Sequence, residues 1–404
     1  MQIYTVGGAI RDELLGIEVQ DKDYVVVGAD IADMLKLGYR QVGSDFPVFL
    51  HPQSHDEYAL ARTERKSGKG YKGFTVAFGR EVTLEEDLYR RDLSINAMAQ
   101  DAHGNIIDPF GGQQDLKQRI IRHVSPHFRE DPLRVLRLAR FAAKLKPFGF
   151  NIAPETKVFL QEMVASGELS ELTPERVWTE TEKALATAHP ATYFLSLQQC
   201  GALKVLFPEI DALFGLGQPR KWHPEIDVGV HVMQVLQAAC ELSEDTVVRF
   251  AALAHDFGKG NTPTDILPSH RAHEQRSVDL LKKFYQRYPV PNKYKSIANR
   301  VAEFHGHVHK VSEMKPATVI KLLNKLKAWQ QPDEFQQFLL ACKADSRGRT
   351  GFEQGSFPQA KVLSEIVEKT KDIRLSEAER GNLTGENIGN ALNQKRARLV
   401  DPIR

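Results

Sequence analysis

The chain has 404 residues, of which 42% are hydrophobic and 26% are charged, and its formal net charge is +2 at pH 7. This composition is typical of a soluble globular protein, and no apolar run approaches the roughly 20 residues of a membrane helix, so we expect no membrane association. A chain of this length predicts two to four domains. The three cysteines, Cys200, Cys240 and Cys342, lie far apart, so we expect free thiols and a cytoplasmic protein.

The N-terminal stretch holds the first candidate functional residues. An apolar run over residues 3–6 leads into Gly7-Gly8, and a helix-like segment that carries Arg11 follows. Glycines lack Cβ atoms, so their N–H groups can approach a phosphate closely, and the start of a helix adds a favourable dipole. We therefore expect a phosphate-binding turn beside which Arg11 donates charge-assisted hydrogen bonds to a triphosphate.

Paired acidic residues stand at the start of the next β-branched run. Alternate residues of a strand point to the same face, so Asp21 and Asp23 project together if residues 21–23 are extended. Paired carboxylates suit Mg²⁺ that holds substrate phosphates. The alternative is a turn followed by a solvated carboxylate pair. Glu57, which opens a later strand, is a candidate third carboxylate or an ordinary surface residue.

The segment from residue 62 to 112 carries two basic features. Residues 62–73 are rich in Lys, Arg and Gly, which predicts a flexible loop that contacts phosphates or an RNA backbone. Arg90 and Arg91 precede an apolar stretch that we interpret as a helix start, where their charges oppose the helix dipole unless an anion such as a nucleotide binds there. We expect the head of the protein to end at the glycine pair at residues 111–112.

From about residue 116 the hydrophobic periodicity is helical. Asp131-Pro132 is a suitable N-cap and first helical residue, so Asp131 has a plain structural interpretation as a helix cap. Arg134, Arg137 and Arg140 follow at intervals of three, which forms a strip that turns about 60° per step around a helix. Three closely spaced arginines repel one another unless they face anions or water.

In this order, the Gly-Gly turn, the paired aspartates, the Arg-Arg-Asp segment and the Glu-Asp-x-x-Arg helix resemble the bacterial-type (class II) CCA-adding tRNA nucleotidyltransferases over about half of the chain, residues 1–210. The resemblance implies an α+β fold, with a polymerase-β-like head that has a small mixed sheet, followed by an all-α neck and body. It implies template-independent addition of C, C and A to tRNA 3′ ends from CTP and ATP. It also implies residue roles: nucleotide binding by Gly8, Arg11, Arg91, Arg137 and Arg140, Mg²⁺ binding by Asp21 and Asp23, and base selection by Asp131 and Arg134.

The implied base selection has a physical reason. Cytosine and adenine each present an amino donor beside a ring-nitrogen acceptor, whereas uracil and guanine present the reverse order. A carboxylate only accepts and a guanidinium only donates hydrogen bonds. A fixed pair of Asp131 and Arg134 would therefore match C and A and would leave unpaired polar groups against U and G.

A third group of residues follows after about residue 222. His231, the adjacent pair His255-Asp256 and the distant Asp345 resemble the pattern of the HD phosphohydrolase superfamily. The resemblance implies an all-α HD domain that hydrolyses phosphate esters as a phosphatase, 2′-nucleotidase or 2′,3′-cyclic phosphodiesterase in tRNA maturation and repair. Imidazole and carboxylate ligands suit a divalent transition metal such as Ni²⁺. Further candidate ligands are His270, His273 and His305, whereas His307 and His309 are expected at the surface.

We therefore expect four parts: a head at residues 1–112, a neck and body at 113–222, an HD domain at 223–350 and a helical segment without a recognisable motif at 351–404. The expected partners are tRNA, CTP and ATP, and the chain is a monomer or a homodimer. Three alternatives are a bacterial poly(A) polymerase, an HD phosphohydrolase whose head only binds nucleotide, and a non-catalytic tRNA-binding protein. The HD pattern and the mildly basic C-terminus favour CCA addition over poly(A) synthesis, and the intact acidic residues argue against the other two.

Overall fold

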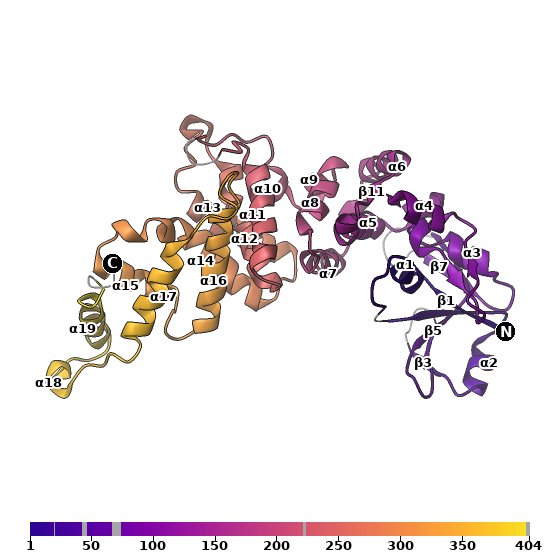
Figure 1. Cartoon of the computed structure of the whole chain (residues 1–404), viewed down its shortest axis with the longest axis horizontal. Helices are drawn as coiled ribbons and strands as arrows, with labels where there is room; N and C mark the ends of the chain where they lie inside the picture. The colour runs from indigo at the N-terminus through magenta and orange to yellow at the C-terminus, as the bar shows by residue number, and fades with distance from the viewer. Residues whose placement is uncertain (20, 43–46, 67–73, 221–223, 401–404) are drawn as a thin grey trace. The chain divides into compact units, whose positions relative to one another are not determined.

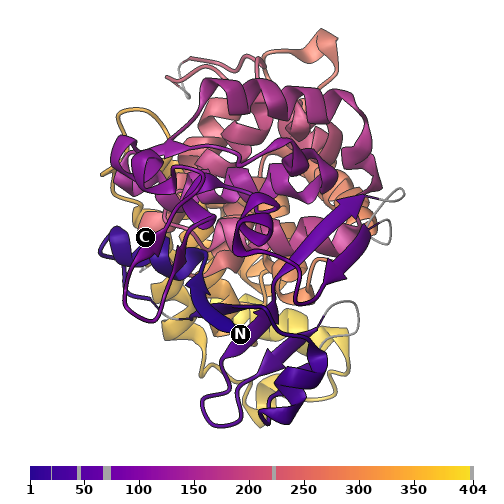
Figure 2. The ribbon, with the colours of Figure 1, turned by 90° about the vertical axis from the view of Figure 1, so that its right-hand side faces the viewer.

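The computed structural model describes residues 1–19, 21–42, 47–66, 74–220 and 224–400. The chain divides into two compact units (Figure 1; Figure 2 gives a second view). The first unit comprises Met1–Ala184 and Thr192–Leu206, and the second comprises Leu185–Ala191 and Phe207–Arg404. No helix within the described ranges is both long and apolar enough to cross a lipid bilayer.

The first unit begins with a seven-stranded mixed sheet, whose strand order is β3-β4-β5-β2-β1-β8-β9. Only β2 and β5 run parallel, and all other neighbours in this sheet are antiparallel. The strands are β1 (Gln2–Val6), β2 (Asp23–Val27), β3 (Arg40–Val42), β4 (Val48–Leu50), β5 (Glu57–Leu60), β8 (Ala99–Gln100) and β9 (Ile106–Ile107). The predicted small mixed sheet is therefore confirmed.

Strand β2 is buried on both faces, which explains its run of β-branched residues. Val25 packs with Val6 and Leu88 in one hydrophobic cluster, and Val26 packs with Phe49 in a cluster on the other face. Asp23 has the parity of Val25, so its side chain leaves the sheet on the first of these faces. The sheet thus fixes the side on which the carboxylate projects.

Two smaller sheets complete the β structure. An antiparallel hairpin joins β6 (Arg62–Lys66) to β7 (Phe74–Phe78), and residues 67–73 of the predicted basic loop lie outside the described residues. A short parallel pair joins β10 (Ile120–Ile121) to β11 (Asn151–Ile152), which ties the chain on either side of helix α5 together.

The rest of the first unit is helical, as predicted. Its longest helix, α5 (Leu133–Leu145), buries an almost continuous apolar surface, and its arginines are carried between these apolar positions. The other helices are α1 (Gly8–Leu14), α2 (Ile31–Lys36), α3 (Leu84–Tyr89), α4 (Gly112–Gln118), α6 (Pro154–Ala165), α7 (Pro174–Leu185), α8 (Pro190–Gln199) and α9 (Ala202–Leu206).

The second unit contains no β-strand among its described residues, which agrees with the predicted all-α HD domain. Helices α11, α12, α14 and α16 pack against one another, and small residues such as Ala239, Ala252 and Ala344 let their axes approach closely (Figure 1). The helices are α10 (Pro208–Asp211), α11 (Val228–Leu242), α12 (Thr246–Ala254), α13 (His273–Arg287), α14 (Asn292–His309), α15 (Pro316–Lys325), α16 (Pro332–Arg347), α17 (Pro358–Thr370), α18 (Glu377–Arg380) and α19 (Glu386–Ala397).

A tight contact fixes the start of α13. The 3-10 helix η5 (Phe257–Asn261) lies so close to α13 that a Cβ atom on Gly258 would be 2.1 Å from the carbonyl oxygen of His273 and 2.4 Å from the nitrogen of Ser277. Gly258 N–H also donates to the Ser277 hydroxyl. Only glycine allows this approach, which holds His273 near the residues that precede η5.

Candidate functional sites

A cavity of about 810 Å³ in the first unit lies where β1 ends and where β2 and β5 begin. The predicted residues of this unit all line it: Gly8, Arg11, Asp21, Asp23, Arg91, Asp131, Arg134, Arg137 and Arg140. Other lining residues carry charge as well, among them Glu57, Arg62, Arg90, Asp92, Lys144 and Lys183. Lys and Arg outnumber Asp and Glu in this lining, so the cavity suits a polyanion.

Two carboxylates of this cavity, those of Asp23 and Glu57, lie at the starts of neighbouring strands, whereas Asp21 precedes β2 and lies outside the strand that was expected to include it. Asp23 and Glu57 are Cα partners in the parallel pair of β2 and β5, so their side chains leave the sheet on the same face. Asp21, Asp23 and Glu57 are all exposed to the cavity. Hard oxygen donors of this kind fit Mg²⁺ better than a transition metal. Glu57 lines the same cavity as Asp21 and Asp23, which favours the interpretation as a third carboxylate over that of an ordinary surface residue.

The glycine turn and Arg11 form the neighbouring wall. Gly7 has φ of 77°, and a Cβ atom there would lie 3.0 Å from Nη1 of Arg91. Arg11 is buried, and its Nη1 donates to Oδ1 of Asn96 over 2.5 Å while its Nε donates to Asp12 over 2.8 Å. These two bonds hold the guanidinium beside the start of α1.

Arg90 and Arg91 follow the end of α3 rather than starting a helix, so our interpretation of this segment was wrong. At this end of a helix, positive charges are favourable. Both guanidiniums pair with the buried carboxylate of Asp87, at 2.6 Å and 3.1 Å. Burial alone would raise the pKa of Asp87, but the two arginines outweigh it and lower the pKa. The anion that balances the charges of Arg90 and Arg91 is therefore the Asp87 carboxylate of the protein itself.

Asp92 anchors Arg137. Nε and Nη2 of Arg137 both donate to Oδ2 of Asp92, over 2.9 and 2.7 Å, and Asn96 donates to its Oδ1. Burial would raise the pKa of Asp92, but Arg137 and Asn96 together lower it to about 2. From the sequence, Asp92 was recognised only as the acid of the Arg-Arg-Asp segment, without a role of its own.

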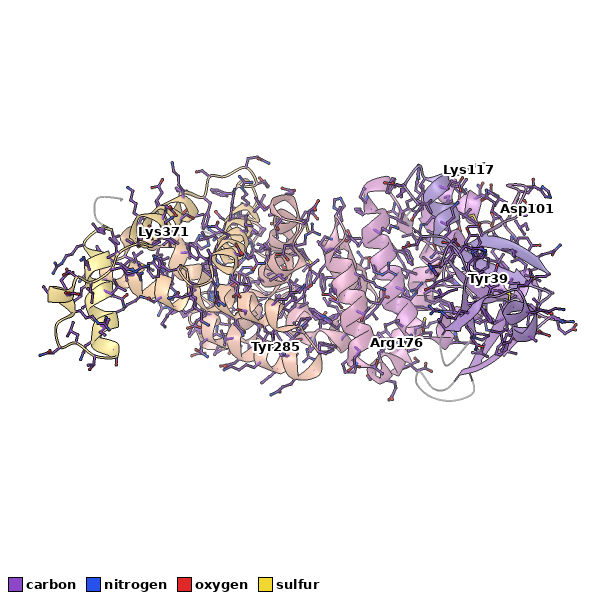
Figure 3. The ribbon with its side chains drawn as sticks, turned by 90° about the horizontal axis from the view of Figure 1, so that it is seen from below. Tyr39, Asp101, Lys117, Arg176, Tyr285 and Lys371 are labelled. Atoms are coloured by element: carbon purple, nitrogen blue, oxygen red, sulfur yellow. The ribbon has the colours of Figure 1, made fainter. Side chains whose placement is uncertain are left out.

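Asp131 and Arg134 are held by backbone groups and by α7. Helix α5 begins at Leu133, one residue later than predicted, yet Oδ1 of Asp131 accepts a hydrogen bond from the Leu133 N–H and so caps the helix. Arg176 on α7, labelled in Figure 3, donates to Oδ2 of Asp131. Arg134 is buried and donates to the carbonyl oxygens of His127 and Arg90, over 2.9 and 2.5 Å. Both side chains therefore have a fixed orientation at the cavity.

An aromatic ring and a second helix support the remaining arginines. Arg11, Arg137 and Arg140 all lie near the face of Phe141, at 5.0, 5.8 and 4.5 Å from the ring centroid. Arg140 also donates to the buried carboxylate of Glu180 on α7 over 2.6 Å. Sequence reasoning missed Phe141, Glu180 and Arg176, and only the i, i+3 spacing of the arginines hinted that they needed partners.

The second candidate site is a cluster of buried imidazoles and carboxylates in the second unit. Helices α11 and α16 supply His231 and Asp345, and the adjacent His255 and Asp256 directly follow α12. Nε2 of His255 lies 3.1 Å from Oδ2 of Asp256, and Nε2 of His231 lies 3.3 Å from Oδ1 of Asp345. The structure therefore brings together all four residues of the predicted HD pattern.

Some of the further candidate histidines belong to this cluster and others do not. Nε2 of His273 and of His305 lie 3.2 and 3.7 Å from Oδ1 of Asp256, so both belong to the cluster. His270 is buried but bonds to Thr262 and to the Gly217 carbonyl instead. His307 is exposed, as predicted. His309 was wrongly expected at the surface, because its Nε2 lies 2.6 Å from Oδ2 of Asp345.

The donor set of this cluster fits a divalent transition metal. The Nδ1 atoms of His255 and His305 each lie within hydrogen-bond distance of a main-chain carbonyl oxygen, at 2.7 and 2.8 Å. A carbonyl only accepts, so in the neutral rings the proton sits on Nδ1 and Nε2 carries the lone pair that a metal needs. Burial lowers the pKa of His305 to about 3, which keeps it neutral at pH 7. Within each group of three candidate ligand residues of this cluster, the three ligand atoms all lie within 4.8 Å of one another.

Lys259 provides positive charge beside the cluster. Its Nζ lies 2.7 Å from Oδ2 of Asp256 and donates to Gln218. Burial would raise the pKa of Asp256, but His255 and Lys259 lower it well below its usual range. Asp256 is therefore ionised at neutral pH, as a metal ligand must be.

Three protein families match the chain. The Poly A polymerase head domain matches residues 3–122, the probable RNA and SrmB-binding site of polymerase A matches residues 149–214, and the HD domain matches residues 228–333. The first and third of these imply dependence on divalent metal ions, in agreement with the two donor sets.

Curated relatives match over the full length. The multifunctional CCA protein of Thioalkalivibrio sulfidiphilus is 55% identical over 404 residues, which is 100% of this chain and 99% of that protein. That of Nitrosococcus oceani is 52% identical over 99% of this chain and 98% of that protein. The Thermotoga maritima CCA-adding enzyme in complex with tRNA has a similar fold, with a TM-score of 0.65 and 23% identity over 99% of this chain and 87% of that one. These relatives favour CCA addition over the alternative of poly(A) synthesis. The chain therefore belongs to the multifunctional CCA protein family of CCA tRNA nucleotidyltransferases.

Proposed function

We propose that the enzyme adds C, C and A to tRNA 3′ ends from CTP and ATP, and that it does so in the cavity beside β2 and β5. One observation carries this proposal: a single cavity joins a glycine turn, acidic side chains on adjacent strands and the arginines of α5. The glycine turn at Gly8 with Arg11 and Arg91 binds the triphosphate. Arg137 and Arg140 bind the nucleotide from the side of α5.

Asp21 and Asp23 hold Mg²⁺, with Glu57 as a third carboxylate. Bound there, the metal supplies activation of the tRNA 3′ hydroxyl and charge neutralisation at the leaving pyrophosphate. The protein's own contribution is to aim these oxygens. Strand pairing fixes Asp23 beside Glu57, and the buried valines of β2 fix the face from which Asp23 projects.

Asp131 and Arg134 select the base. The carboxylate accepts from the amino group of C or A, and the guanidinium donates to the neighbouring ring nitrogen. The existing bonds from Leu133, Arg176 and two carbonyl groups support this role, because they prevent either side chain from turning to suit U or G. Unpaired buried groups then disfavour the wrong base.

The HD domain hydrolyses phosphate esters at damaged or incompletely processed tRNA 3′ ends. His231, His255, Asp256 and Asp345 hold a divalent transition metal such as Ni²⁺, which supplies polarisation of the phosphoryl group. Lys259 lies within reach of the same centre and offers a positive charge to a phosphate oxygen. We also propose that the enzyme acts in the cytoplasm, where its three free cysteines stay reduced.

Incubation with radiolabelled CTP or ATP and tRNA lacking its CCA end tests the first activity. CTP alone should be incorporated, which a poly(A) polymerase does not do. Absence of CTP incorporation by the intact chain would reject the proposal.

Hydrolysis of a 2′,3′-cyclic nucleotide to the nucleoside monophosphate in the presence of Ni²⁺ tests the second activity. His255→Ala and Asp256→Ala should abolish this hydrolysis and leave CTP incorporation within about twofold of wild type, since the two sites belong to different compact units. Undiminished hydrolysis in both variants would show that His255-Asp256 is structural.

A further inference from the structure

Two lysines in the lining of the 810 Å³ cavity have no role in the reaction proposed above. Lys144 lies in the last turn of α5, and Lys183 lies in the last turn of α7. The side chain of Lys144 is partly exposed, and Lys183 is exposed. Each residue therefore offers an ammonium group to whatever the cavity binds.

Lys144 shares its carboxylate partner with Arg11. Its Nζ lies 3.0 Å from Oδ2 of Asp12, and Nη2 of Arg11 lies 2.7 Å from Oδ1 of the same side chain. One negative charge thus faces two positive charges, which leaves an excess of positive charge at this wall of the cavity. In the proposed function Arg11 binds the triphosphate, so the excess charge lies beside the triphosphate.

The arginines that precede Lys144 on α5 are balanced one to one. Arg137 pairs with Asp92 over 2.7 Å, and Arg140 pairs with Glu180 over 2.6 Å. A balanced arginine can orient a nucleotide, but it adds little net charge to the cavity. The unbalanced charge beside Lys144 can instead compensate the negative charge that a ligand brings.

Both lysines lie one helical turn beyond the same junction of α5 and α7. The bond from Nε of Arg140 to Glu180 joins the two helices. Lys144 follows Arg140 by four residues and Lys183 follows Glu180 by three, so each lysine is a neighbour of its junction residue on the helix surface. A rise of 1.5 Å per residue also places Lys144 about 15 Å along α5 from the base-selecting Arg134. The lysines therefore belong to the end of the cavity that is distant from the base.

We propose that Lys144 and Lys183 bind the γ-phosphate of the incoming CTP or ATP and hold the pyrophosphate as it leaves. In the transfer, the tRNA 3′ hydroxyl loses its proton to solvent and its oxygen bonds to the α-phosphorus. The bond from that phosphorus to the oxygen shared with the β-phosphate breaks. This oxygen keeps the bonding electrons, so negative charge grows on the pyrophosphate, where fixed ammonium groups stabilise it. The inference rests on the proposed CCA addition and adds two residues to its triphosphate site.

A phosphate of the tRNA backbone is the other anion that could meet these lysines. The carboxylate of Asp12 favours the nucleotide, because it ties Lys144 to Arg11 at the triphosphate and not to the outer surface of the helices. The two anions predict different kinetic effects, so one set of measurements distinguishes them.

Inhibition by inorganic pyrophosphate and by CMP tests the proposal, because pyrophosphate lacks the base and CMP lacks the β- and γ-phosphates. Full-length wild type, Lys144→Gln, Lys183→Gln and the double variant are assayed for CTP incorporation into tRNA lacking its CCA end. The inhibition constant of pyrophosphate and the KM for CTP should rise about 3-fold in each single variant, as for a partly exposed charge pair, and about 10-fold in the double variant. The inhibition constant of CMP should stay at the wild-type value.

Lys146→Gln is the matched control for charge. Lys146 directly follows α5, is exposed and does not line the cavity, so this variant should behave as wild type. Lys183→Gln controls for an indirect effect through Arg11. Lys144 shares Asp12 with Arg11, whereas no ion pair joins Lys183 to another described residue.

The possible results separate this inference from the function on which it rests. Unchanged pyrophosphate inhibition in Lys183→Gln and in the double variant would overturn it. Equal weakening of pyrophosphate and CMP would also overturn it, because that result means a distorted cavity. A higher KM for tRNA with a weaker salt dependence, at unchanged pyrophosphate inhibition, would assign the lysines to the RNA backbone instead. In all three cases wild type still incorporates CTP, whereas failure of wild type to do so would overturn the proposed CCA addition itself.

Discussion

Nη2 of Arg176 lies 2.8 Å from Oδ2 of Asp131, so that both oxygens of this carboxylate have partners, the other being the Leu133 N–H. The bond joins α7 to the start of α5 across the edge of the cavity. It fixes the plane of the Asp131 carboxylate more firmly than helix capping alone. Asp131 is thus both a helix cap and a rigid acceptor.

The first prediction separates these two roles. Asp131→Asn keeps an acceptor for the Leu133 N–H and loses only the partly exposed ion pair with Arg176. The free energy of unfolding should therefore fall by less than about 1 kcal/mol. The amide now also donates, which blurs the distinction between C and U. The preference for CTP over UTP, measured as a ratio of kcat/KM on tRNA lacking its CCA end, should fall by about 10-fold or more.

Arg134→Ala should also lose this preference, and with weaker incorporation, because Arg134 has no capping role. Arg129→Gln is the control, since Arg129 is exposed, pairs with Glu162 and does not line this cavity. An unchanged CTP preference in both Asp131→Asn and Arg134→Ala would return Asp131 to the role of a cap and place selectivity elsewhere.

The second prediction concerns the carboxylates on β2 and β5. Asp21→Ala and Asp23→Ala should abolish incorporation of CTP and ATP and spare Ni²⁺-dependent hydrolysis. Glu57→Gln should reduce kcat by about 10- to 100-fold, because it removes the negative charge beside Asp23 without changing the pairing of β2 with β5. The reduced rate should recover partly as Mg²⁺ is raised. A Glu57→Gln enzyme with wild-type kcat at all Mg²⁺ concentrations would make Glu57 an ordinary surface residue.

The third prediction uses the pH dependence of Asp92. The pKa of Asp92 is lowered from 3.8 to about 2 in the folded protein, so its ionised form stabilises the fold at pH above about 4 and loses this contribution as the pH falls toward 2. Asp92→Asn should therefore lower the free energy of unfolding by about 2 kcal/mol at pH 7. The difference from wild type should shrink steadily below pH 4.

Urea unfolding, followed by pulsed hydrogen exchange of peptides from α5, measures this difference in the first unit alone. The ion pairs of Asp87 with Arg90 and Arg91 do not confound the comparison of wild type with Asp92→Asn, because both proteins contain them. A difference that stays constant from pH 7 to pH 3 would mean that Arg137 gains no stabilisation from the charge of Asp92.

Sequence reasoning grouped correctly the candidate residues that are close together along the chain. Asp21 with Asp23 and the arginines of α5 are of this kind: all line the expected cavity, although Asp21 precedes β2 and is not placed by strand alternation. It failed where distant segments meet. The pairing of Asp23 with Glu57 depends on strand order, and the roles of His273 and Glu180 depend on helix packing, neither of which leaves a local pattern.

Arg90 and Arg91 show a different kind of failure. Their unfavourable charge was attributed to a helix start that awaits a nucleotide, but they follow α3 and share the buried Asp87. The acid lies three and four residues earlier on the same helix, which is the spacing of side-chain neighbours. That local signal was present in the sequence and was overlooked.

The fourth prediction concerns Gly258. Gly258→Ala places a methyl group against the backbone of α13, so η5 or the start of α13 must move, at a cost of about 1 to 3 kcal/mol. Hydrolysis and Ni²⁺ binding should fall because His273 moves away from Asp256. Gly260→Ala in the same short helix is the matched control, since its added Cβ would meet mainly the side chain of Ala212 at 3.1 Å. Equal Ni²⁺ binding by both variants would contradict the positioning role of Gly258.

The register of β2 and β5 also limits how this head can vary in length. Residues 28–56 connect the two strands and include α2, β3 and β4, so that only insertions in an exposed turn, such as residues 52–55, leave the pairing of Asp23 with Glu57 unchanged. Within the strands the tolerance vanishes, because deletion of a single residue between Asp23 and Val25 would turn the acidic side chain toward the opposite face of the sheet. The exposed turn at residues 52–55 is therefore the place to add a tag or a new loop to this enzyme, whereas a shift within the strands keeps the acidic side chain on its face of the sheet only if it is by an even number of residues.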